Sequence, residues 1–423
     1  MRVFKFGGAS VKNADAVRNV GEVLKAHTNS PTLVVISAMG KTTNMLEELC
    51  SAYYHNKKEK KDILKKIKKF HSEITDELIQ DEFDYYEVDN LFIELECIIE
   101  KRFDKKTSYD ALYDRIVSFG ELISTKIVST YLNRSGYKNR WIDARNFVIT
   151  NEVHRAANVL WDTSVELMNS NLKSLVKRQT VISQGFIGRN ERHETTTLGR
   201  EGSDYSAAIF AYALNADSVT IWKDVEGVMN ADPKRFDKTV LIEQMSYNEA
   251  IELAYYGASV IHPKTIQPLK SKGIPLYVKS FLNPSLKGSS VLENDDRTLN
   301  DTECYIVKEN QCIFSIASRD YSFIAENNLE RIFSAFAKER VQSNLMQNTA
   351  ISFKACLNYE EDKIDRLKEE LKEWFHIEVK KDLKLFTVFN YHEKKGNVPK
   401  LIKGHKIVLE QKSNFALQLV LEH

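Results

Sequence analysis

Three stretches of the sequence place lysine, arginine and acidic side chains beside glycines, where a chain can come close to a phosphate group. The first is Lys5-Phe6-Gly7-Gly8-Ala9-Ser10, which follows an apolar strand. Adjacent glycines let the backbone approach a ligand, and a following helix N-terminus favours an anion. The Lys5 ammonium can then lie against phosphate oxygens. The spacing matches neither the P-loop nor the GxGxxG fingerprint, so a plain tight turn remains an equal alternative.

The second stretch is TTTLGREGSD, residues 195–204, between a strand region and a helix. Gly199 to Ser203 can wrap a phosphate, and the planar guanidinium of Arg200 suits a carboxylate. The alternative is structural, with Ser203 and Asp204 serving only as the cap and first turn of the helix. An arginine among three threonines and two glycines is unusual for a simple connector, which favours a binding role.

The third stretch is WKDVEGVMNADPK, residues 222–234, in which a strand end is followed by a loop with Gly, Asn and Pro. Open α/β sheets bind ligands beyond the carboxyl ends of their strands. The acids and lysines of this loop could hold a ribose or a phosphate. Asp-Pro is equally a turn initiator, so a plain surface loop is an even alternative.

Other polar residues that could bind a ligand are isolated in the sequence. Ser37 follows an apolar strand, Thr43 lies near a helix start, and Glu121 is next to a glycine in a helical stretch. Taken singly, such residues are more often caps or surface residues than ligands. His262 has no neighbouring partner for acid–base chemistry, and we expect a structural histidine bonded to the backbone.

The elements that must position these residues alternate between strands and helices. Apolar strands are predicted at 3–6 and 33–36, with a helix of period 3.6 between them at 13–27. Strand, glycine turn, helix and apolar strand form a βαβ unit of a parallel sheet. The alternation returns with strands at 181–188, 218–222 and 274–279 and helices at 203–214 and 246–256. The expected fold of residues 1–292 is an α/β sandwich around a mainly parallel sheet.

Residues 44–133 have a helical pattern instead and predict an insertion that covers a site. Eight lysines fall within residues 57–69, which could indicate a nucleic-acid or membrane surface. Ile63, Leu64, Ile67 and Phe70 interrupt them at helical spacing, which favours one packed face and a solvated remainder. Acidic residues between 73 and 87 offset the charge.

The C-terminal part predicts a separate module. Residues 293–303 are polar and without apolar period, which is typical of a linker. Residues 304–420 predict strands at 312–317, 349–357, 383–390 and 415–421 and helices at 328–339 and 362–374. Two helices on one face of a small antiparallel sheet make an α+β domain of βαββαβ character. The final residues, 421–423, resemble the first letters of an expression tag and are left out of this fold.

Composition excludes several classes of protein. The 423 residues carry 60 Lys+Arg against 59 Asp+Glu, whereas a dedicated nucleic-acid binder usually has a basic surplus. The five cysteines form no CxxC pair, which favours a reducing cytoplasm over a disulfide framework or a zinc site. The sequence has no run of about 18 apolar residues and no apolar segment behind its N-terminus, so we expect neither a membrane span nor a secretory signal.

Together these stretches resemble the aspartate kinases of the amino acid kinase family. KFGGAS is similar to that family's opening KFGGTS, and VVISAMGKTTN to its second strand and turn. The strings FGE, SQGFIG, TTTLGREGSD, WKDVEGVMNADP, GASVIHP and VKSFLNPSLKG follow in the family's order. The resemblance covers residues 1–292, and the region from about Cys312 resembles the ACT regulatory module of those enzymes. No homoserine dehydrogenase domain follows, so the resemblance is to the monofunctional form.

The resemblance implies transfer of the γ-phosphoryl group of ATP, with Mg²⁺, to the side-chain carboxylate of L-aspartate, the first step towards lysine, threonine and methionine. The residue types agree, because an ionised carboxylate needs no general base and the reaction mainly requires two anions to be neutralised and aligned. By analogy Lys5 and Asp204 are catalytic, while no side chain is expected to be a metal ligand. The implied substrate contacts are Ser37, Thr43, Glu121 (on the ammonium), Arg200 (on the α-carboxylate) and Ser203. The implied nucleotide contacts are Lys5, Gly7, Gly8, Ser10, Lys223, Asp224, Met229, Asp232, Lys234 and Ser259.

Some positions depart from the family's pattern. Glu201 stands where the motif has Gly, and its carboxylate should repel phosphates unless it points outward. Ala9 replaces a Thr, and Ser259 replaces a frequent Lys. Two other functions stay open, namely another acyl-phosphate kinase, acting for instance on glutamate or acetylglutamate, and an inactive amino-acid sensor. Glu121 with Arg200 favours an unblocked amino acid.

The ACT-like region implies an amino-acid effector and a homodimer formed through these modules. Residues 392–406, HEKKGNVPKLIKGHK, lack a clear apolar period, so the second of two expected ACT units looks reduced. Whether lysine or threonine would be the inhibitor is not readable from the sequence.

Overall fold

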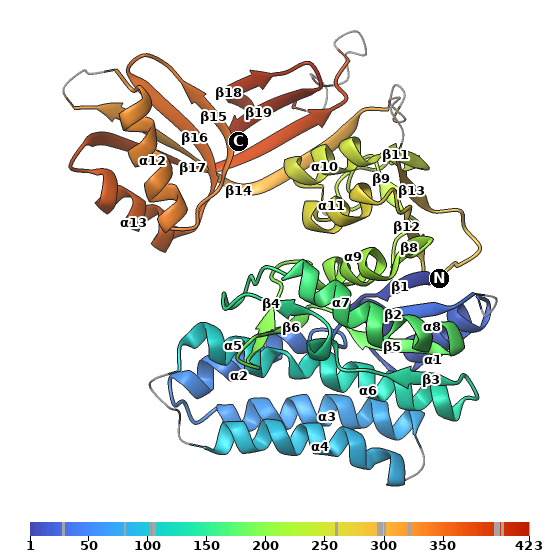
Figure 1. The fold of residues 1–423 in the computed structure, drawn as a ribbon. Helices are drawn as coiled ribbons and strands as arrows, with labels where there is room; N and C mark the ends of the chain where they lie inside the picture. The colour runs from blue at the N-terminus through green and yellow to red at the C-terminus, as the bar shows by residue number, and fades with distance from the viewer. Residues whose placement is uncertain are drawn as a thin grey trace. The chain divides into compact units, whose positions relative to one another are not determined.

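The computed structural model describes residues 1–27, 30–79, 82–101, 103, 107–258, 261–293, 299, 302–319, 323–392, 398 and 402–422 (Figure 1). Its contacts divide the chain into two compact units. The first consists of Met1–Val228, Leu241–Ile251 and Val260–Thr298. The second consists of Met229–Val240, Glu252–Ser259 and Leu299–His423. No helix of the described residues combines the length and the apolar character needed to cross a membrane.

The first unit is built around an eight-stranded sheet with the order β11-β13-β12-β8-β1-β2-β5-β3. All neighbouring strands are parallel except β12 and β13. The strands are β1 (Arg2–Phe6), β2 (Thr32–Ile36), β3 (Asn139–Trp141), β5 (Thr180–Gln184), β8 (Ser218–Lys223), β11 (Gln244–Ser246), β12 (Leu276–Ser280) and β13 (Ser289–Leu292). Central strands such as β2 are buried along their whole length, as parallel strands covered on both faces must be. The predicted α/β class with a mainly parallel sheet is confirmed.

Helices cover both faces of this sheet (Figure 1). The buried, alanine-rich α9 (Gly202–Leu214) packs on β1, β2 and β8, while α6 (Phe119–Arg134) lies against β2, β3 and β5. The predicted first helix is α1 (Ala14–Lys25), capped by the Asn13 side chain, which accepts a hydrogen bond from the Ala16 N–H. The remaining helices outside the insertion are η1 (Gly8–Val11), η2 (Ala144–Asn146), α7 (Trp161–Asn171), α8 (Lys173–Arg178), α10 (Tyr247–Tyr256) and α11 (Pro263–Ser271).

Two small sheets complete the parts before residue 293. The first has the order β4-β6-β7, formed by β4 (Ile149–Thr150), β6 (Ile187–Asn190) and β7 (Thr195–Thr197). The second pairs β9 (Val228–Met229) with β10 (Leu241–Ile242). β7 leads directly into the turn before α9, so this small sheet supports the second glycine-containing stretch of the sequence.

The predicted helical segment forms α2 (Thr42–Tyr54), α3 (Lys60–Leu78), α4 (Glu82–Glu100), α5 (Tyr109–Val117) and α6. Leu64, Ile67 and Ile74 form the buried face of α3, whereas its lysines are exposed or half-buried. Lys68 pairs with Glu96 of α4 at 2.6 Å. Burial lowers the pKa of His71, which is enclosed between the helices, to about 4 and keeps it neutral. The solvated-helix interpretation of the lysine run is confirmed.

The second unit contains a six-stranded sheet with the order β15-β16-β14-β17-β19-β18, in which all neighbours are antiparallel. Its elements are β14 (Cys304–Ser318), α12 (Glu326–Lys338), β15 (Ser343–Asn348), β16 (Ser352–Asn358), α13 (Glu361–Leu371), β17 (Phe375–Phe389), β18 (Lys406–Lys412) and β19 (Ala416–Glu422). Apolar residues of both helices, such as Phe336 and Leu367, pack with Phe314 and Phe353 of the sheet. The first six elements follow the predicted βαββαβ order, and the α+β class is confirmed.

The structure also differs from the predicted elements in this unit. β15 and β18 have no counterpart among the predicted strands, because each buries a single residue, Leu345 and Leu409 respectively. Leu421 and Glu422, assigned above to a tag remnant, belong to β19 and pair with β17, and Leu421 is buried. Residues 294–298 of the predicted linker and most of 393–401 lie outside the described residues, as does His423.

Candidate active site

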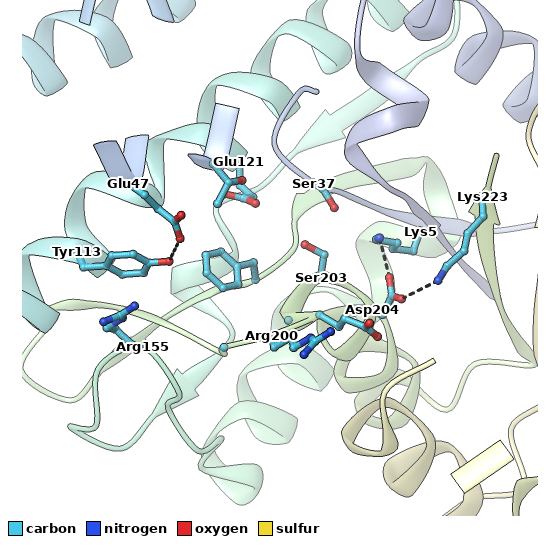
Figure 2. Close-up of a pocket in the computed structure, with 15 residues that line it drawn as sticks. Lys5, Ser37, Glu47, Tyr113, Glu121, Arg155, Arg200, Ser203, Asp204 and Lys223 are labelled. Carbon is cyan, nitrogen blue, oxygen red and sulfur yellow. Dashed lines mark hydrogen bonds and ion pairs between the residues drawn. The ribbon is translucent and has the colours of Figure 1, made fainter. Parts of the chain in front are cut away.

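A cavity of about 570 Å³ opens in the first unit where β1, β2 and β8 end (Figure 2). Lys5 comes from β1, Ser37 follows β2, and Lys223 ends β8. This is the carboxyl edge of a parallel sheet, where α/β proteins bind ligands. The lining residues are Lys5, Ser37, Thr43, Glu47, Tyr113, Glu121, Arg155, Phe186, Gly199, Arg200, Glu201, Gly202, Ser203, Asp204 and Lys223.

At one end of the cavity a single carboxylate lies between two ammonium groups (Figure 2). The Lys5 Nζ is 2.6 Å from Asp204 Oδ1, and the Lys223 Nζ is 4.0 Å from Asp204 Oδ2. The Lys5 and Asp204 side chains are only 10% and 5% exposed, so water screens this pair weakly. Asp204 also lies in the first turn of α9, where the helix dipole favours an anion. Two cations around one acid leave a net positive charge, which suits a phosphate.

The turn before α9 has an unusual backbone. Glu201 occupies the N-cap position with φ 54° and ψ 26°, in the left-handed region, and Gly199 has φ 81°. A Cβ on Gly202 would lie 2.7 Å from the Phe186 ring, so the close approach of α9 to the cavity requires glycine there. The helix therefore begins at Gly202, and the predicted cap role of Ser203 is wrong because Glu201 holds that position. Glu201 lines the cavity, and its buried Oε2 has no hydrogen-bond partner among the described residues.

Glu121 places a partly unpaired carboxyl group at the middle of the cavity, as far as the described residues show. Its Oε1 accepts a hydrogen bond from the Ala38 N–H at 3.2 Å, whereas its Oε2 is buried and has no partner in the described part of the chain. Burial raises the pKa of Glu121 to about 8, against the smaller opposite effects of the backbone hydrogen bonds and of Lys5. A buried carboxylate oxygen of this kind is suited to a cationic ligand group.

At the other end, three side chains from separate elements meet (Figure 2). The Tyr113 hydroxyl of α5 donates to Glu47 Oε1 of α2 at 2.5 Å, and the Arg155 guanidinium lies 4.3 Å from the centre of the Tyr113 ring. Burial and the Glu47 hydrogen bond raise the pKa of Tyr113, so it remains a neutral donor. These three residues and Phe186 were not predicted as site residues, although Phe186 lies within the SQGFIG string. No local motif marks Glu47, Tyr113 or Arg155, because only the packing of α2, α5 and the 151–158 loop brings them together.

The structure brings together eight of the site residues predicted from the sequence. Lys5, Ser37, Thr43, Glu121, Arg200, Ser203, Asp204 and Lys223 all line the cavity. Gly7, Gly8, Ser10 and Asp224 do not line it. Met229, Asp232 and Lys234 belong to the second unit, and Ser259 lies outside the described residues.

Two further predictions concern Gly8 and His262. A Cβ on Gly8 would lie 2.8 Å from the Ala38 carbonyl oxygen, so tight packing of the first turn against the 38–40 loop explains this glycine. His262 is the N-cap of α11, and its Nδ1 accepts a hydrogen bond from the Lys264 N–H at 3.2 Å. The predicted structural role of His262 is confirmed.

Comparison with known proteins agrees with this arrangement. A model of the amino acid kinase family matches residues 1–280. This chain belongs to the amino acid kinase family. The lysine-sensitive aspartokinase 3 of Escherichia coli is 31% identical over 363 residues, which cover 84% of this chain and 78% of that protein. The chain thus falls among the aspartokinases of the family, as its sequence motifs suggested.

A solved structure of E. coli aspartokinase III in complex with aspartate and ADP, in the R-state, covers 100% of this chain and 96% of its own, with a TM-score of 0.86 and 27% identity. The T-state structure of the same enzyme, in complex with lysine and aspartate, has a TM-score of 0.79 and 28% identity, and covers 99% of this chain and 95% of its own. Aspartokinase 1 of Arabidopsis thaliana, a chloroplastic protein, is 30% identical over 84% of this chain. This chain spans 63% of the length of that relative and 66% of Arabidopsis aspartokinase 2.

Proposed function

We propose that this protein phosphorylates the side-chain carboxylate of L-aspartate with ATP, giving 4-phospho-L-aspartate and ADP. The observation that carries the proposal is the buried Glu121 Oε2, which has no partner among the described residues and lies in the same cavity as Arg200, Lys5 and Lys223. An acid and an arginine match the ammonium and the α-carboxylate of an amino acid, and the two lysines match phosphate. The aspartate and ADP bound by the E. coli relative support this choice of substrates.

The proposed reaction needs little covalent chemistry from the protein. An oxygen of the aspartate side chain, ionised at neutral pH, attacks the γ-phosphorus of ATP, and the bond to the β,γ-bridging oxygen breaks as ADP leaves. Lys5 and Lys223 stabilise the negative charge of the transferring group. Asp204 fixes both ammonium groups through the contacts described above. The cavity thus supplies charge and alignment rather than a base.

The remaining substrate contacts follow from the lining of the cavity. Glu121 would bind the substrate ammonium and Arg200 its α-carboxylate. The hydroxyl groups of Ser37, Thr43 and Ser203 would complete the hydrogen bonds around the amino acid. Proposed nucleotide contacts in the first unit are Lys5, Lys223, Gly7, Gly8, Ser10 and Asp224. Those of Met229, Asp232, Lys234 and Ser259 stay predictions from the sequence.

The residues at the start of α9 also fit a magnesium ion carried by ATP. Kinase sites hold Mg²⁺ with one or two carboxylates plus substrate phosphates and water. Asp204 and Glu201 line the same cavity, and the buried Glu201 Oε2 lacks a partner among the described residues. The ion would supply charge neutralisation between the phosphates. It would also remove the repulsion expected between Glu201 and ATP. Glu201 and Asp204 would hold the ion, which departs from the expectation from the sequence that no side chain is a metal ligand.

The C-terminal part of the second unit, from residue 304, is proposed to regulate the catalytic domain. We take residues 1–292 as the catalytic domain, 293–303 as a linker and 304–420 as an ACT-like regulatory region that binds an amino-acid effector and forms a homodimer. The lysine bound by the E. coli relative supports an amino-acid effector. The five cysteines are free thiols, four of them buried, which fits a cytoplasmic setting.

The experiment that tests the function is hydroxylamine trapping of the acyl phosphate with Mg·ATP and a panel of acids. We expect the hydroxamate with L-aspartate and not with L-glutamate, N-acetyl-L-glutamate or acetate. Product with glutamate but not with aspartate would show that the protein is a glutamate kinase and that the proposed substrate is wrong. No product with any acid, together with calorimetric binding of amino acids, would point to the inactive sensor.

A further inference from the structure

Arg155 lies in the cavity without a role in the function proposed above. Its backbone has φ 65°, in the left-handed region that side chains with a Cβ rarely adopt. Such a conformation is strained and persists only where the surroundings enforce it. Residues held in this way gather at ligand sites, so the backbone of Arg155 calls for a functional explanation.

A buried carboxylate enforces this backbone. Asp114 of α5 is fully buried, and it accepts hydrogen bonds from the Arg155 N–H at 3.0 Å through Oδ2 and at 3.2 Å through Oδ1. It also accepts hydrogen bonds from His154 Nδ1 at 2.9 Å and from the Thr197 hydroxyl at 2.6 Å. Thr197 ends β7, three residues before Arg200. One carboxylate therefore fixes both chain segments that bring arginines to the cavity.

The Arg155 side chain has unused hydrogen-bonding capacity. A guanidinium has five N–H donors. Among the described residues it makes one side-chain hydrogen bond, from Nη1 to Asp110 Oδ1 at 3.4 Å, and Asp110 is 40% exposed. The guanidinium carbon lies over the Tyr113 ring, 4.3 Å from its centre, and this cation–π contact uses none of the N–H donors. The neighbouring acid, Glu47, is already engaged by the Tyr113 hydroxyl.

We infer that Arg155 is a second carboxylate-binding residue of the substrate site, which holds the α-carboxylate of the amino acid together with Arg200. The ammonium has its partner in the Glu121 Oε2, which has no partner among the described residues. The side-chain carboxylate must face the γ-phosphate, which Lys5 and Lys223 bind in the proposed reaction. This leaves the α-carboxylate as the group that matches a guanidinium with free donors. Asp114 is then a positioning residue that acts through the backbone of Arg155. The inference rests on the proposed function and deepens it.

The test compares Arg155→Gly, Arg155→Lys and the control Asp110→Asn in the full chain. Glycine accepts the left-handed backbone, so Arg155→Gly removes the guanidinium without adding strain, and its melting temperature should equal or exceed that of the wild type. Because a charged hydrogen bond is lost, we expect its KM for L-aspartate to rise ~10- to 100-fold, with KM for ATP within ~3-fold. Arg155→Lys should recover part of this loss, and Asp110→Asn should leave KM unchanged.

A substrate analogue separates the inference from the proposed function. β-Alanine is aspartate without its α-carboxylate, so its binding, measured by competition with aspartate, should be equal in wild type and Arg155→Gly. An unchanged KM for aspartate in Arg155→Gly, or an equal weakening of aspartate and β-alanine, would overturn the role of Arg155. A wild-type protein that forms no aspartyl phosphate would instead refute the proposed function.

Discussion

The two ends of the cavity are built in different ways. At the phosphate end, Lys5, Lys223 and Asp204 project from two central strands and a buried helix, and the charges hold one another at 2.6 and 4.0 Å. At the far end, Glu47, Tyr113 and Arg155 come from two helices of the insertion and a loop with a strained backbone. In the proposed function the central strands and α9 therefore supply the chemistry, whereas the insertion and the loop determine which acid binds. The five predictions below test this division.

The largest effect is expected at the phosphate end. Lys5→Ala should lower kcat by about 10²- to 10³-fold, because a preorganised cation at the transferring phosphoryl group is lost. KM for L-aspartate should change much less, as measured by steady-state kinetics of ADP release. Lys223→Ala is the matched comparison and should cost less, since Lys223 lies farther from Asp204. Near-normal turnover in Lys5→Ala would remove Lys5 from the mechanism.

The next effect concerns Glu121 between the two ends. Only its ionised form attracts an ammonium, and its pKa is raised to about 8, so wild-type KM for L-aspartate should fall as pH rises from 6 towards about 8. Glu121→Gln should abolish this slope and raise KM by ~10- to 100-fold at pH 8, because a charged hydrogen bond is lost. A KM that does not vary with pH in the wild type would contradict the assignment.

Glu121 should also make the stability of the protein depend on pH. Rising pH should strengthen substrate binding but weaken the folded state. The folded pKa of about 8 exceeds the ordinary value of 4.5, so between these values the folded state holds a proton that the unfolded state has released. The free energy of unfolding of the wild type should therefore decrease as pH rises from about 4.5 to about 8. Urea titrations of wild type and Glu121→Gln should show this decrease in the wild type only.

A smaller effect is expected from Asp114→Asn at the far end. In this variant one carboxylate oxygen is replaced by an NH₂ group, which cannot accept the hydrogen bonds from the Arg155 N–H or His154 Nδ1. A buried donor left without an acceptor costs about 1–3 kcal/mol of unfolding free energy. KM for L-aspartate should rise several-fold, whereas the pH profile set by Glu121 should not move. Thr197→Val, which removes one donor to the same carboxylate, is the matched variant and should cost less. An unaltered KM in a destabilised Asp114→Asn would leave Asp114 a purely structural residue.

The smallest effect is expected on the outer surface of the insertion. Lys65 and Lys66 are exposed on α3, away from its buried face. The double substitution Lys65→Glu, Lys66→Glu should leave kcat and KM unchanged and alter stability by no more than about 0.5 kcal/mol, as typical surface changes do. A large change in kcat, in KM or in stability would show that this face of α3 contacts another part of the protein or a partner.

The fold could be predicted wherever apolar period determines an element. β1, α1, β2 and α9 all lie within about two residues of their predicted bounds, because each buries a continuous or periodic apolar set. β15 and β18 could not be predicted, since a strand that buries one residue is held by backbone pairing to its neighbour, which leaves no pattern in its own sequence.

The site residues could be predicted where a charged side chain lies next to a glycine that the backbone of a turn requires. Lys5, Arg200 and Asp204 are adjacent to glycines that the turns require, so their stretches stand out in the sequence. Glu47, Tyr113 and Arg155 lie in ordinary helical and loop sequence and meet only through packing. The left-handed backbone of Arg155 is likewise set by Asp114, 41 positions earlier, and no local residue signals it.

The position of β1 in the sheet affects how the chain can assemble during synthesis. β1 lies between β2, which follows it closely in sequence, and β8, which begins at Ser218. A ribosome adding about 5–20 residues per second needs roughly 10–40 s between these two partners. During that interval one edge of β1 is open to pairing with other chains, and until residue 204 has been synthesised Lys5 also lacks its partner Asp204. The growing polypeptide therefore passes through a stage at which a chaperone able to shield a strand edge would have most to protect.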